Sequence, residues 1–133
     1  MKVQHKRGKF GEDYTAEYLT NKGYQIIARN FRRRGGELDI VALKGGMLIV
    51  VEVKTRKFGS LTDGTDAITY TKKKNIILTS AKFLQENEPE FSEMRFDVAE
   101  IVVTTEENPR ILEFNYYEDA FTADGFETIT AWL

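Results

Sequence analysis

The sequence contains no cysteine and only one histidine, His5, among its 133 residues. Without cysteine there is no disulfide and no thiolate metal site, and a cytoplasmic protein is the default expectation. A serine hydrolase needs a catalytic histidine, and a catalytic zinc site usually needs two or three, so a lone histidine argues against both classes. Any metal must therefore be bound by carboxylate and carbonyl oxygens, which favour Mg²⁺, Mn²⁺ or Ca²⁺.

Long apolar runs are missing as well. No run approaches the roughly 20 residues that a membrane helix needs, and residues 1–10 are basic and polar, so we expect neither a membrane span nor a secretory signal. The chain is 41% hydrophobic and 30% charged, which is typical of a globular protein, and we expect a single domain over residues 1–133.

The net charge of −2 is unevenly distributed along the chain. Residues 106–133 hold seven acids and one base, a net charge of −6, while residues 1–105 have a net charge of +4. A basic body with an acidic tail suggests a polyanionic partner. A solvated surface with an acidic end explains the same charges, so charge alone does not select the partner.

Hydrophobic periodicity and turn residues predict the element order α-β-β-β-α-β-β. The expected elements are a helix at 7–21, strands at 24–34, 37–43 and 47–56, a helix at 65–86, and strands at 95–104 and 111–117. The continuous apolar run at residues 47–51 indicates a central strand that is buried on both faces. From about residue 119 we expect an acidic, aromatic extension that folds over its own sheet or packs against a second subunit in a homodimer.

Asp39, Glu52 and Lys54 are the residues that most strongly suggest chemistry. Glu52 and Lys54 lie two positions apart on the third strand, so their side chains point to the same face. A tight turn at residues 45–46 makes the second and third strands an antiparallel hairpin in which Asp39 lies opposite Glu52.

Two opposed carboxylates in an apolar setting repel each other unless a cation or a proton intervenes. The pattern therefore favours a divalent ion bound by Asp39, Glu52 and a nearby carbonyl, that of Val53. A buried ion pair between Glu52 and Lys54 is the purely structural alternative. Glu12, on the first helix, either completes this site or is an exposed acid that is favourable near a helix start.

The motif formed by Asp39, twelve further residues and Glu52-Val53-Lys54 on a hairpin resembles the signature of the PD-(D/E)xK nucleases. More closely, the chain resembles the bacterial YraN-type family of predicted endonucleases, which is similar to archaeal Holliday-junction resolvases. The resemblance is carried by residues 8–16, 23–30, 36–42, 51–56 and 95–98.

This resemblance implies a restriction-endonuclease-like α/β fold, with an αβββαβ core and a mixed central sheet flanked by helices. It implies a metal-dependent nuclease that hydrolyses phosphodiester bonds, with branched or damaged DNA as a candidate substrate and Mg²⁺, or Mn²⁺ in its place, as the cofactor. In this chain Asp39 and Glu52 would be metal ligands, Lys54 the catalytic lysine and Glu12 an auxiliary acid.

Several basic residues near the motif are candidates for contacts with nucleic-acid phosphates. They are Arg29, Arg32, Arg33, Arg34, Arg56 and Lys72. For Lys72, which lies in a run of three lysines, a solvated helix face is the alternative. Asp97 either supports the site or pairs with Arg95. A non-catalytic nucleic-acid-binding module on the same fold is the alternative function, and a protein-interaction domain is a third.

Overall fold

Two helices and five strands follow one another in the predicted order in a computed structural model that describes residues 3–60 and 68–124. The elements are α1 (Val3–Asn21), β1 (Gln25–Arg33), β2 (Gly36–Lys44), β3 (Met47–Lys57), α2 (Tyr70–Asn87), β4 (Glu93–Val103) and β5 (Ile111–Phe121). Of the described helices, neither is long and apolar enough to cross a membrane.

The strands form one mixed sheet with the spatial order β1-β2-β3-β4-β5. Strands β1, β2 and β3 are joined by tight turns and pair antiparallel, and β4 and β5 also pair antiparallel. Strands β3 and β4 are parallel, which requires a long crossover, and α2 lies in that connection. This topology confirms the mixed sheet with flanking helices of a restriction-endonuclease-like core.

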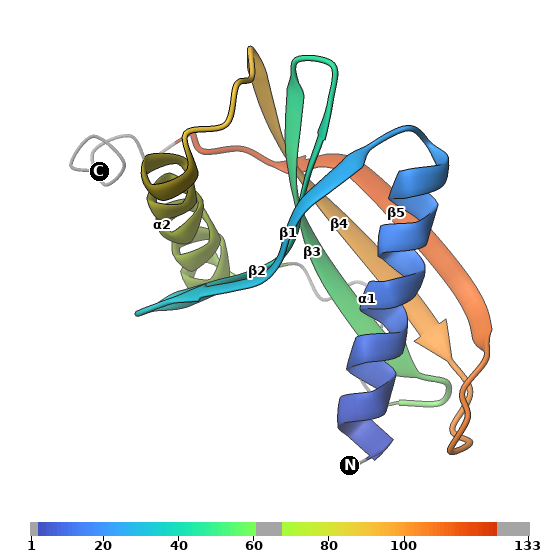
Figure 1. Cartoon of the computed structure of the whole chain (residues 1–133). Helices are drawn as coiled ribbons and strands as arrows, with labels where there is room; N and C mark the ends of the chain where they lie inside the picture. Colours follow the sequence, from blue (N-terminus) through green and yellow to red (C-terminus); the bar gives the residue numbers. More distant parts are fainter. Residues whose placement is uncertain (1–2, 61–67, 125–133) are drawn as a thin grey trace.

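The two helices cover opposite faces of the sheet (Figure 1). The apolar run of β3 serves both faces, because alternate residues of a strand point to opposite sides. Leu48 and Val50 pack in the core beneath α2, whereas Ile49 and Val51 pack in the core beneath α1. All four side chains are at most 3% exposed, so the prediction of a central strand buried on both faces is confirmed.

Capping residues define the ends of the helices more exactly than hydrophobic periodicity does. Helix α1 ends in a Schellman motif, in which Gly23 has a φ of 94° and the Tyr24 N–H bonds to the Leu19 carbonyl oxygen at 3.0 Å. Helix α1 begins at Val3, four residues before its predicted start. Helix α2 begins at Tyr70 rather than near residue 65, because the Thr69 side chain caps it.

The C-terminal extension begins later than we predicted. Strand β5 runs on to Phe121, which is buried and stacks on Phe96 with ring centroids 5.0 Å apart. Residues 119–121 therefore belong to β5, and Phe121 is part of the core beneath α2. Residues 125–133 lie outside the described part of the chain, so the choice between a folded-back tail and a homodimer stays a prediction.

A buried ion pair within β4, between Arg95 and Asp97, lies on the side of the sheet that α1 covers and is hydrogen-bonded to β5. The Asp97 carboxylate, which is fully buried, accepts hydrogen bonds from Arg95 Nε at 2.8 Å and from the Tyr116 hydroxyl at 2.6 Å. It also accepts one from the Asp119 main-chain N–H at 2.9 Å. Its oxygens are therefore occupied by structural partners, which confirms the structural pairing of Asp97 with Arg95.

We predict that Asp97→Ala lowers the free energy of unfolding by about 3–5 kcal/mol, because it leaves the Arg95 guanidinium largely buried without its main partner. Urea denaturation measures this loss. Glu118→Ala is the matched control, since Glu118 lies 3.6 Å from Arg95 but is 59% exposed, and it should cost less than about 1 kcal/mol. Equal losses in the two variants would contradict a structural role for the buried pair.

Candidate metal and catalytic site

The register of the β2–β3 hairpin brings Asp39 and Glu52 together. Ile40 pairs with Val51 in the last regular rung, and continuing this register by one residue sets Asp39 opposite Glu52. Beyond that rung, Asp39 Oδ2 accepts a hydrogen bond from the Val53 N–H at 2.8 Å. The two carboxyl groups are close enough for the charge of Glu52 to raise the pKa of Asp39. The two acids therefore lie close together where the regular pairing of the hairpin ends, and their direct opposition follows from extending that register by one rung.

A bend in the β1–β2 hairpin places Asp39 at the edge of both cores. Asn30 lies on the rung opposite Asp39 and has a left-handed φ of 54°, which few residues other than glycine and asparagine adopt readily. Leu38 belongs to the core beneath α2, although Ile40, two positions on, belongs to the core beneath α1. The β1–β2 hairpin therefore changes direction at Asn30 and Asp39. This leaves Asp39 half-buried, beside a cleft on the side of α1.

Burial and like charge make this pair of acids costly in its ionised form. Partial burial, followed by the charge of Glu52, raises the pKa of Asp39 to about 7. Burial also raises the pKa of Glu52, although the charges of Lys72 and Lys54 oppose this shift. A carboxyl group that titrates near neutral pH is only partly ionised under physiological conditions, and a nearby cation would favour its ionised form.

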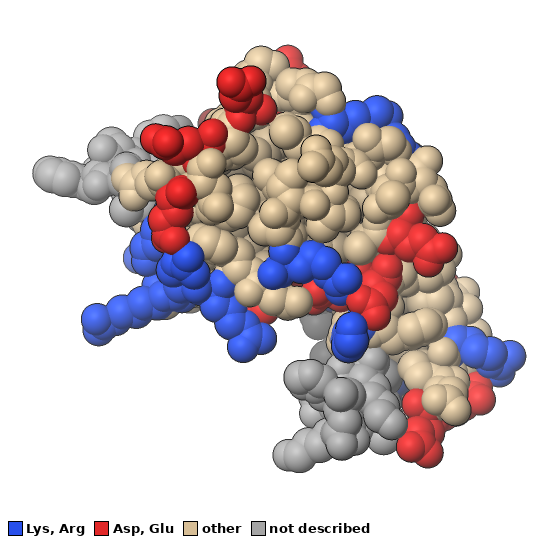
Figure 2. Space-filling model, in the orientation of Figure 1, with Lys and Arg blue, Asp and Glu red and all other residues tan. Residues whose placement is uncertain are grey.

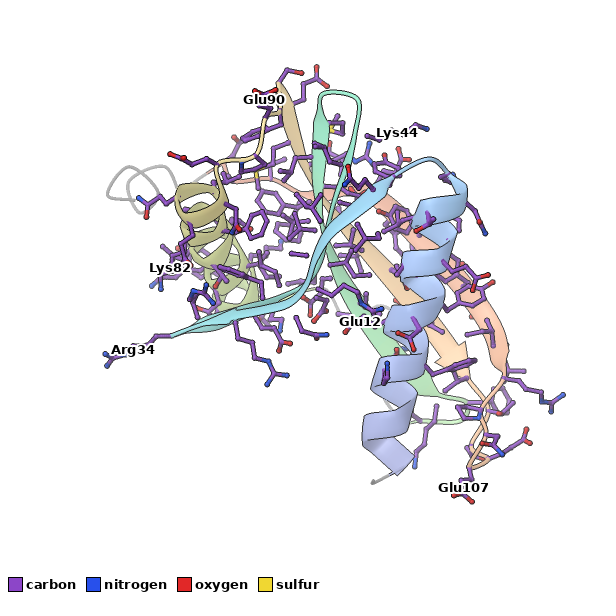
Figure 3. The ribbon with its side chains drawn as sticks, in the orientation of Figure 1. Glu12, Arg34, Lys44, Lys82, Glu90 and Glu107 are labelled. Atoms are coloured by element: carbon purple, nitrogen blue, oxygen red, sulfur yellow. The ribbon has the colours of Figure 1, made fainter. Side chains whose placement is uncertain are left out.

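Glu12 reaches the same region from α1. Its carboxylate accepts hydrogen bonds from Arg29 Nε at 3.1 Å, Arg29 Nη2 at 3.0 Å and Asn30 Nδ2 at 2.8 Å. All three bonds end on one oxygen, Oε1, so the carboxylate is oriented by β1. Figure 3 shows Glu12 pointing from α1 toward the strands. The charge of Glu12 also contributes to the raised pKa of Asp39.

Glu52 lies on the face of the sheet that α2 covers. Lys72, in the first turn of α2, has its Nζ 3.3 Å from Glu52 Oε1, and the Glu52 side chain is only 11% exposed. Lys54 is close enough for its charge to lower the pKa of Glu52. Glu52 therefore interacts with two cations, Lys72 and Lys54, rather than with Lys54 alone as in the structural alternative.

A cleft of about 970 Å³ opens beside Asp39 on the side of α1. Five basic residues line it, together with three acids and Val53 of β3. The basic residues are Lys9, Arg29, Arg32, Arg56 and Lys57, and the acids are Glu12, Glu37 and Asp39. Glu52 and Lys54 do not line this cleft, so Asp39 connects the cleft to the side chains on the α2 face.

The basic residues that we predicted to bind nucleic acid do not form one surface. Arg29 pairs with Glu12 and Asp13, Arg56 with Glu100, and Lys72 with Glu52. Arg32 is 73% exposed beside Glu37, while Arg33 pairs with Glu86 of α2. Arg34 stands at the tip of the hairpin, well away from Glu12 in Figure 3. Figure 2 shows lysine and arginine side chains in several separate patches of the surface in view, with acids beside them.

Asp39 and Glu52 could hold a divalent cation only if a main-chain carbonyl oxygen served as a further ligand. Within residues 3–60 and 68–124, no group of three or more carboxylate or imidazole side chains is close enough to hold a metal ion. Two carboxylates and a carbonyl oxygen are the hard ligands that Mg²⁺ accepts, with water in the remaining positions. The raised pKa of Asp39, caused first by burial and then by the charge of Glu52, supports the fit, because a bound cation would favour the ionised carboxylate.

Sequence reasoning missed the role of Asn30. An asparagine within a strand pattern signals a left-handed backbone or a bend, and the turn at Gly35 places it opposite Asp39. Those two signals were available in the sequence. The contact between Lys72 and Glu52 had no comparable local signal, because it depends on how the crossover returns α2 to the sheet.

Comparison with known proteins gives a consistent set of relatives. A model of the family described as "Uncharacterised protein family UPF0102" matches residues 11–101. A UPF0102 protein of Chlorobium limicola is 42% identical over 121 residues, which cover 88% of this chain and 92% of that protein. One from Rhodococcus opacus is 40% identical and one from Dictyoglomus thermophilum 35% identical, each over 86% of this chain and 94–95% of the relative.

We predict that stability without metal falls as pH rises from about 4 to 7. In this window the folded protein keeps a proton on Asp39, whose pKa is about 7, while the unfolded chain, with a value near 3.8, has lost it. Asp39→Asn should therefore flatten the pH dependence by up to about 1.4 kcal/mol per pH unit.

Urea denaturation in a chelator-containing buffer series measures this slope. Glu52→Gln should flatten it in part, because the charge that raises the pKa of Asp39 is gone. Glu37→Gln is the control, since Glu37 is a smaller contributor and pairs with Arg32. A slope in Asp39→Asn as steep as in the wild type would show that Asp39 titrates normally.

Proposed function

The chain belongs to the uncharacterised protein family UPF0102, and from the chemistry of its site we propose that it is a metal-dependent nuclease. The observation that carries this proposal is the opposition of Asp39 and Glu52, with Lys54 two residues after Glu52 on the same strand. The proposed reaction is hydrolysis of phosphodiester bonds in nucleic acid, with DNA, branched or damaged, as the substrate.

Asp39, Glu52 and the Val53 carbonyl would hold Mg²⁺, or Mn²⁺ in its place. When bound, such a cation supplies the positive charge that favours phosphodiester hydrolysis near neutral pH. Asp39 and Glu52 come from adjacent strands of a sheet, so the ligands are held by main-chain hydrogen bonds rather than by a loop. A shared cation would explain why the fold places Asp39 and Glu52 side by side.

Lys54 and Glu12 have separate roles in this proposal. The Lys54 ammonium group faces the same side as Glu52 and stabilises negative charge that develops on the phosphate. Glu12 is oriented through one oxygen by Arg29 and Asn30, which leaves its second oxygen to accept a hydrogen bond from the attacking water. The basic side chains that line the cleft bind the phosphates on either side.

A non-catalytic nucleic-acid-binding module is the competing function. Basic side chains would help such a module to bind phosphates. Two neighbouring acids, of which Asp39 has a raised pKa, would not help it to bind them. The acids weaken phosphate binding unless a metal neutralises them. The proposal of a nuclease accounts for the acids and the lysine together.

We predict that Mn²⁺ stabilises the wild type by mass action, by about 2.7 kcal/mol at a free concentration of 100 times Kd. The gain should be larger at pH 8 than at pH 6, because protons compete for Asp39, whose pKa is about 7. Thermal unfolding with and without Mn²⁺ measures the gain. Asp39→Asn and Glu52→Gln should lose it, and Glu37→Gln should keep it. A stabilisation that survives in the double variant would place the metal elsewhere.

Lys54→Ala should lower the cleavage rate by about 10²- to 10³-fold while substrate affinity changes little, because the lysine acts on charge that develops in the transition state. A panel of labelled junctions, flaps, single strands and duplexes, incubated with Mg²⁺, measures cleavage. Lys44→Ala is the matched control, since Lys44 contacts the Lys22 carbonyl at the far end of the hairpin. If Lys54→Ala cuts as fast as the wild type, the activity comes from another site or from a contaminant.

A further inference from the structure

The contact between Lys72 and Glu52 joins a movable side chain to a fixed one. Lys72 Nζ lies 3.3 Å from Glu52 Oε1, and the Lys72 side chain is 49% exposed while that of Glu52 is 11% exposed. Glu52 is held within β3, the central strand of the sheet, whereas Lys72 reaches it with the end of a flexible four-carbon stem. Movement of the lysine side chain alone can therefore end the contact.

The start of α2 is an unfavourable place for a lysine unless an anion is close by. The N-terminus of a helix carries a partial positive charge and favours acids in the first turn. The first turn of α2 holds no acid, and Lys72, Lys73 and Lys74 follow its first two residues. The ammonium group of Lys73 lies over the Phe121 ring, 5.9 Å from its centroid, whereas that of Lys72 contacts Glu52. An anionic partner therefore offsets the cost of a cation at Lys72.

Lys72 and a divalent cation would compete for the same carboxylate. In the proposed function, Glu52 binds Mg²⁺ or Mn²⁺ together with Asp39 and the Val53 carbonyl. Like charges a few ångströms apart repel each other, and Lys72 Nζ is 3.3 Å from an oxygen of this ligand. Lys72 therefore has to leave Glu52 when a divalent cation binds there.

The substrate supplies the next anion within reach of Lys72. Hydrolysis at the proposed site requires a phosphate beside Glu52, and the flexible stem of Lys72 already ends at that residue. A lysine ammonium group binds phosphate as a point charge, and the positive end of α2 favours an anion at the same place. The charge of Lys72 can thus pass from a carboxylate to a phosphate without a change in the backbone.

We propose that Lys72 is the counter-ion of Glu52 in the metal-free protein and binds a substrate phosphate once a divalent cation occupies the site. This proposal rests on the proposed nuclease function and assigns one substrate-binding residue to it. Two consequences distinguish it from a purely structural ion pair. Removal of Lys72 strengthens metal binding, whereas removal of a ligand weakens it. Metal and substrate also strengthen each other's binding, because each removes Lys72 from Glu52.

Calorimetric titration of Mn²⁺ in the absence of nucleic acid tests the first consequence. Lys72→Met keeps most of the aliphatic stem and removes the charge, so Mn²⁺ should bind about 3- to 10-fold more tightly than to the wild type. Lys72→Arg keeps the charge and should bind Mn²⁺ within about twofold of the wild type. Lys73→Met is the matched control, because it removes the same charge from the next residue, and it should also stay within about twofold.

The salt dependence of DNA binding tests the second role of Lys72. Fluorescence anisotropy in a Lys54→Ala background, which should keep the probe intact, measures the affinity for a duplex over a salt series. In Mn²⁺, Lys72→Met should flatten the slope of log affinity against log salt by roughly 0.9, the effect of one lost phosphate contact. In a chelator, where Lys72 pairs with Glu52, the slope should change little. Lys73→Met should leave both slopes as in the parent.

Two results would overturn the proposal. One is Mn²⁺ binding to Lys72→Met that is no tighter than to the wild type, and the other is a change of the salt slope that is equal with and without metal. Because the Lys72 side chain is half-exposed, Lys72→Met should melt within a few degrees of the wild type, so loss of folding does not confuse either result.

The same samples separate failure of this proposal from failure of the proposed function. If the wild type binds Mn²⁺ and cleaves, but Lys72→Met binds Mn²⁺ no more tightly, only the role of Lys72 is wrong. If the wild type neither binds Mn²⁺ nor cleaves any nucleic acid, the proposed nuclease function is wrong and the role of Lys72 falls with it.

Discussion

The closeness of the Asp39 and Glu52 carboxylates is the interaction on which the account of this protein depends. Two neighbouring acids that are partly withdrawn from water cannot both ionise cheaply, so burial and the charge of Glu52 raise the pKa of Asp39 to about 7. The fold does not relieve this cost with an arginine, although arginines are close by. The Arg29 guanidinium forms ion pairs with Glu12 and Asp13 instead. Lys72, with its Nζ 3.3 Å from Glu52, and Lys54 offset part of the cost at Glu52. Asp39 is left to take up a proton or a bound cation, and the nuclease proposal starts from that choice.

The rest of the molecule holds this pair in place. Strand β3 is buried on both faces by the cores beneath α1 and α2, so Glu52 is fixed at the end of a rigid run. The bend at Asn30 turns Asp39 out of the cores, and the Asn30 amide also orients Glu12. A substitution at Asn30 would therefore affect two acids at once. A site built on strands in this way keeps its geometry without a bound ligand.

Much of this arrangement could be predicted from the sequence, because it depends on local rules. The period of two along β3 and the tight turn at Gly45 sufficed to place Asp39 opposite Glu52, and the unbroken apolar run identified the central strand. Contacts set by tertiary packing could not be predicted. Arg33 appeared to be a phosphate contact, but it pairs with Glu86, 53 residues away on α2. The extent of β5 was underestimated, since only the core shows that Phe121 stacks on Phe96.

Calorimetric titration of Mn²⁺ into the protein near pH 7, in two buffers of different ionisation enthalpy, tests the central claim most directly. The difference between the buffers counts the protons released when the metal binds. If a cation replaces the proton shared by the acids, the wild type should release up to about one proton per metal, and Asp39→Asn should bind the metal weakly with no release. Binding of equal affinity in the wild type and in the Asp39→Asn, Glu52→Gln double variant, with no proton released, would contradict the account.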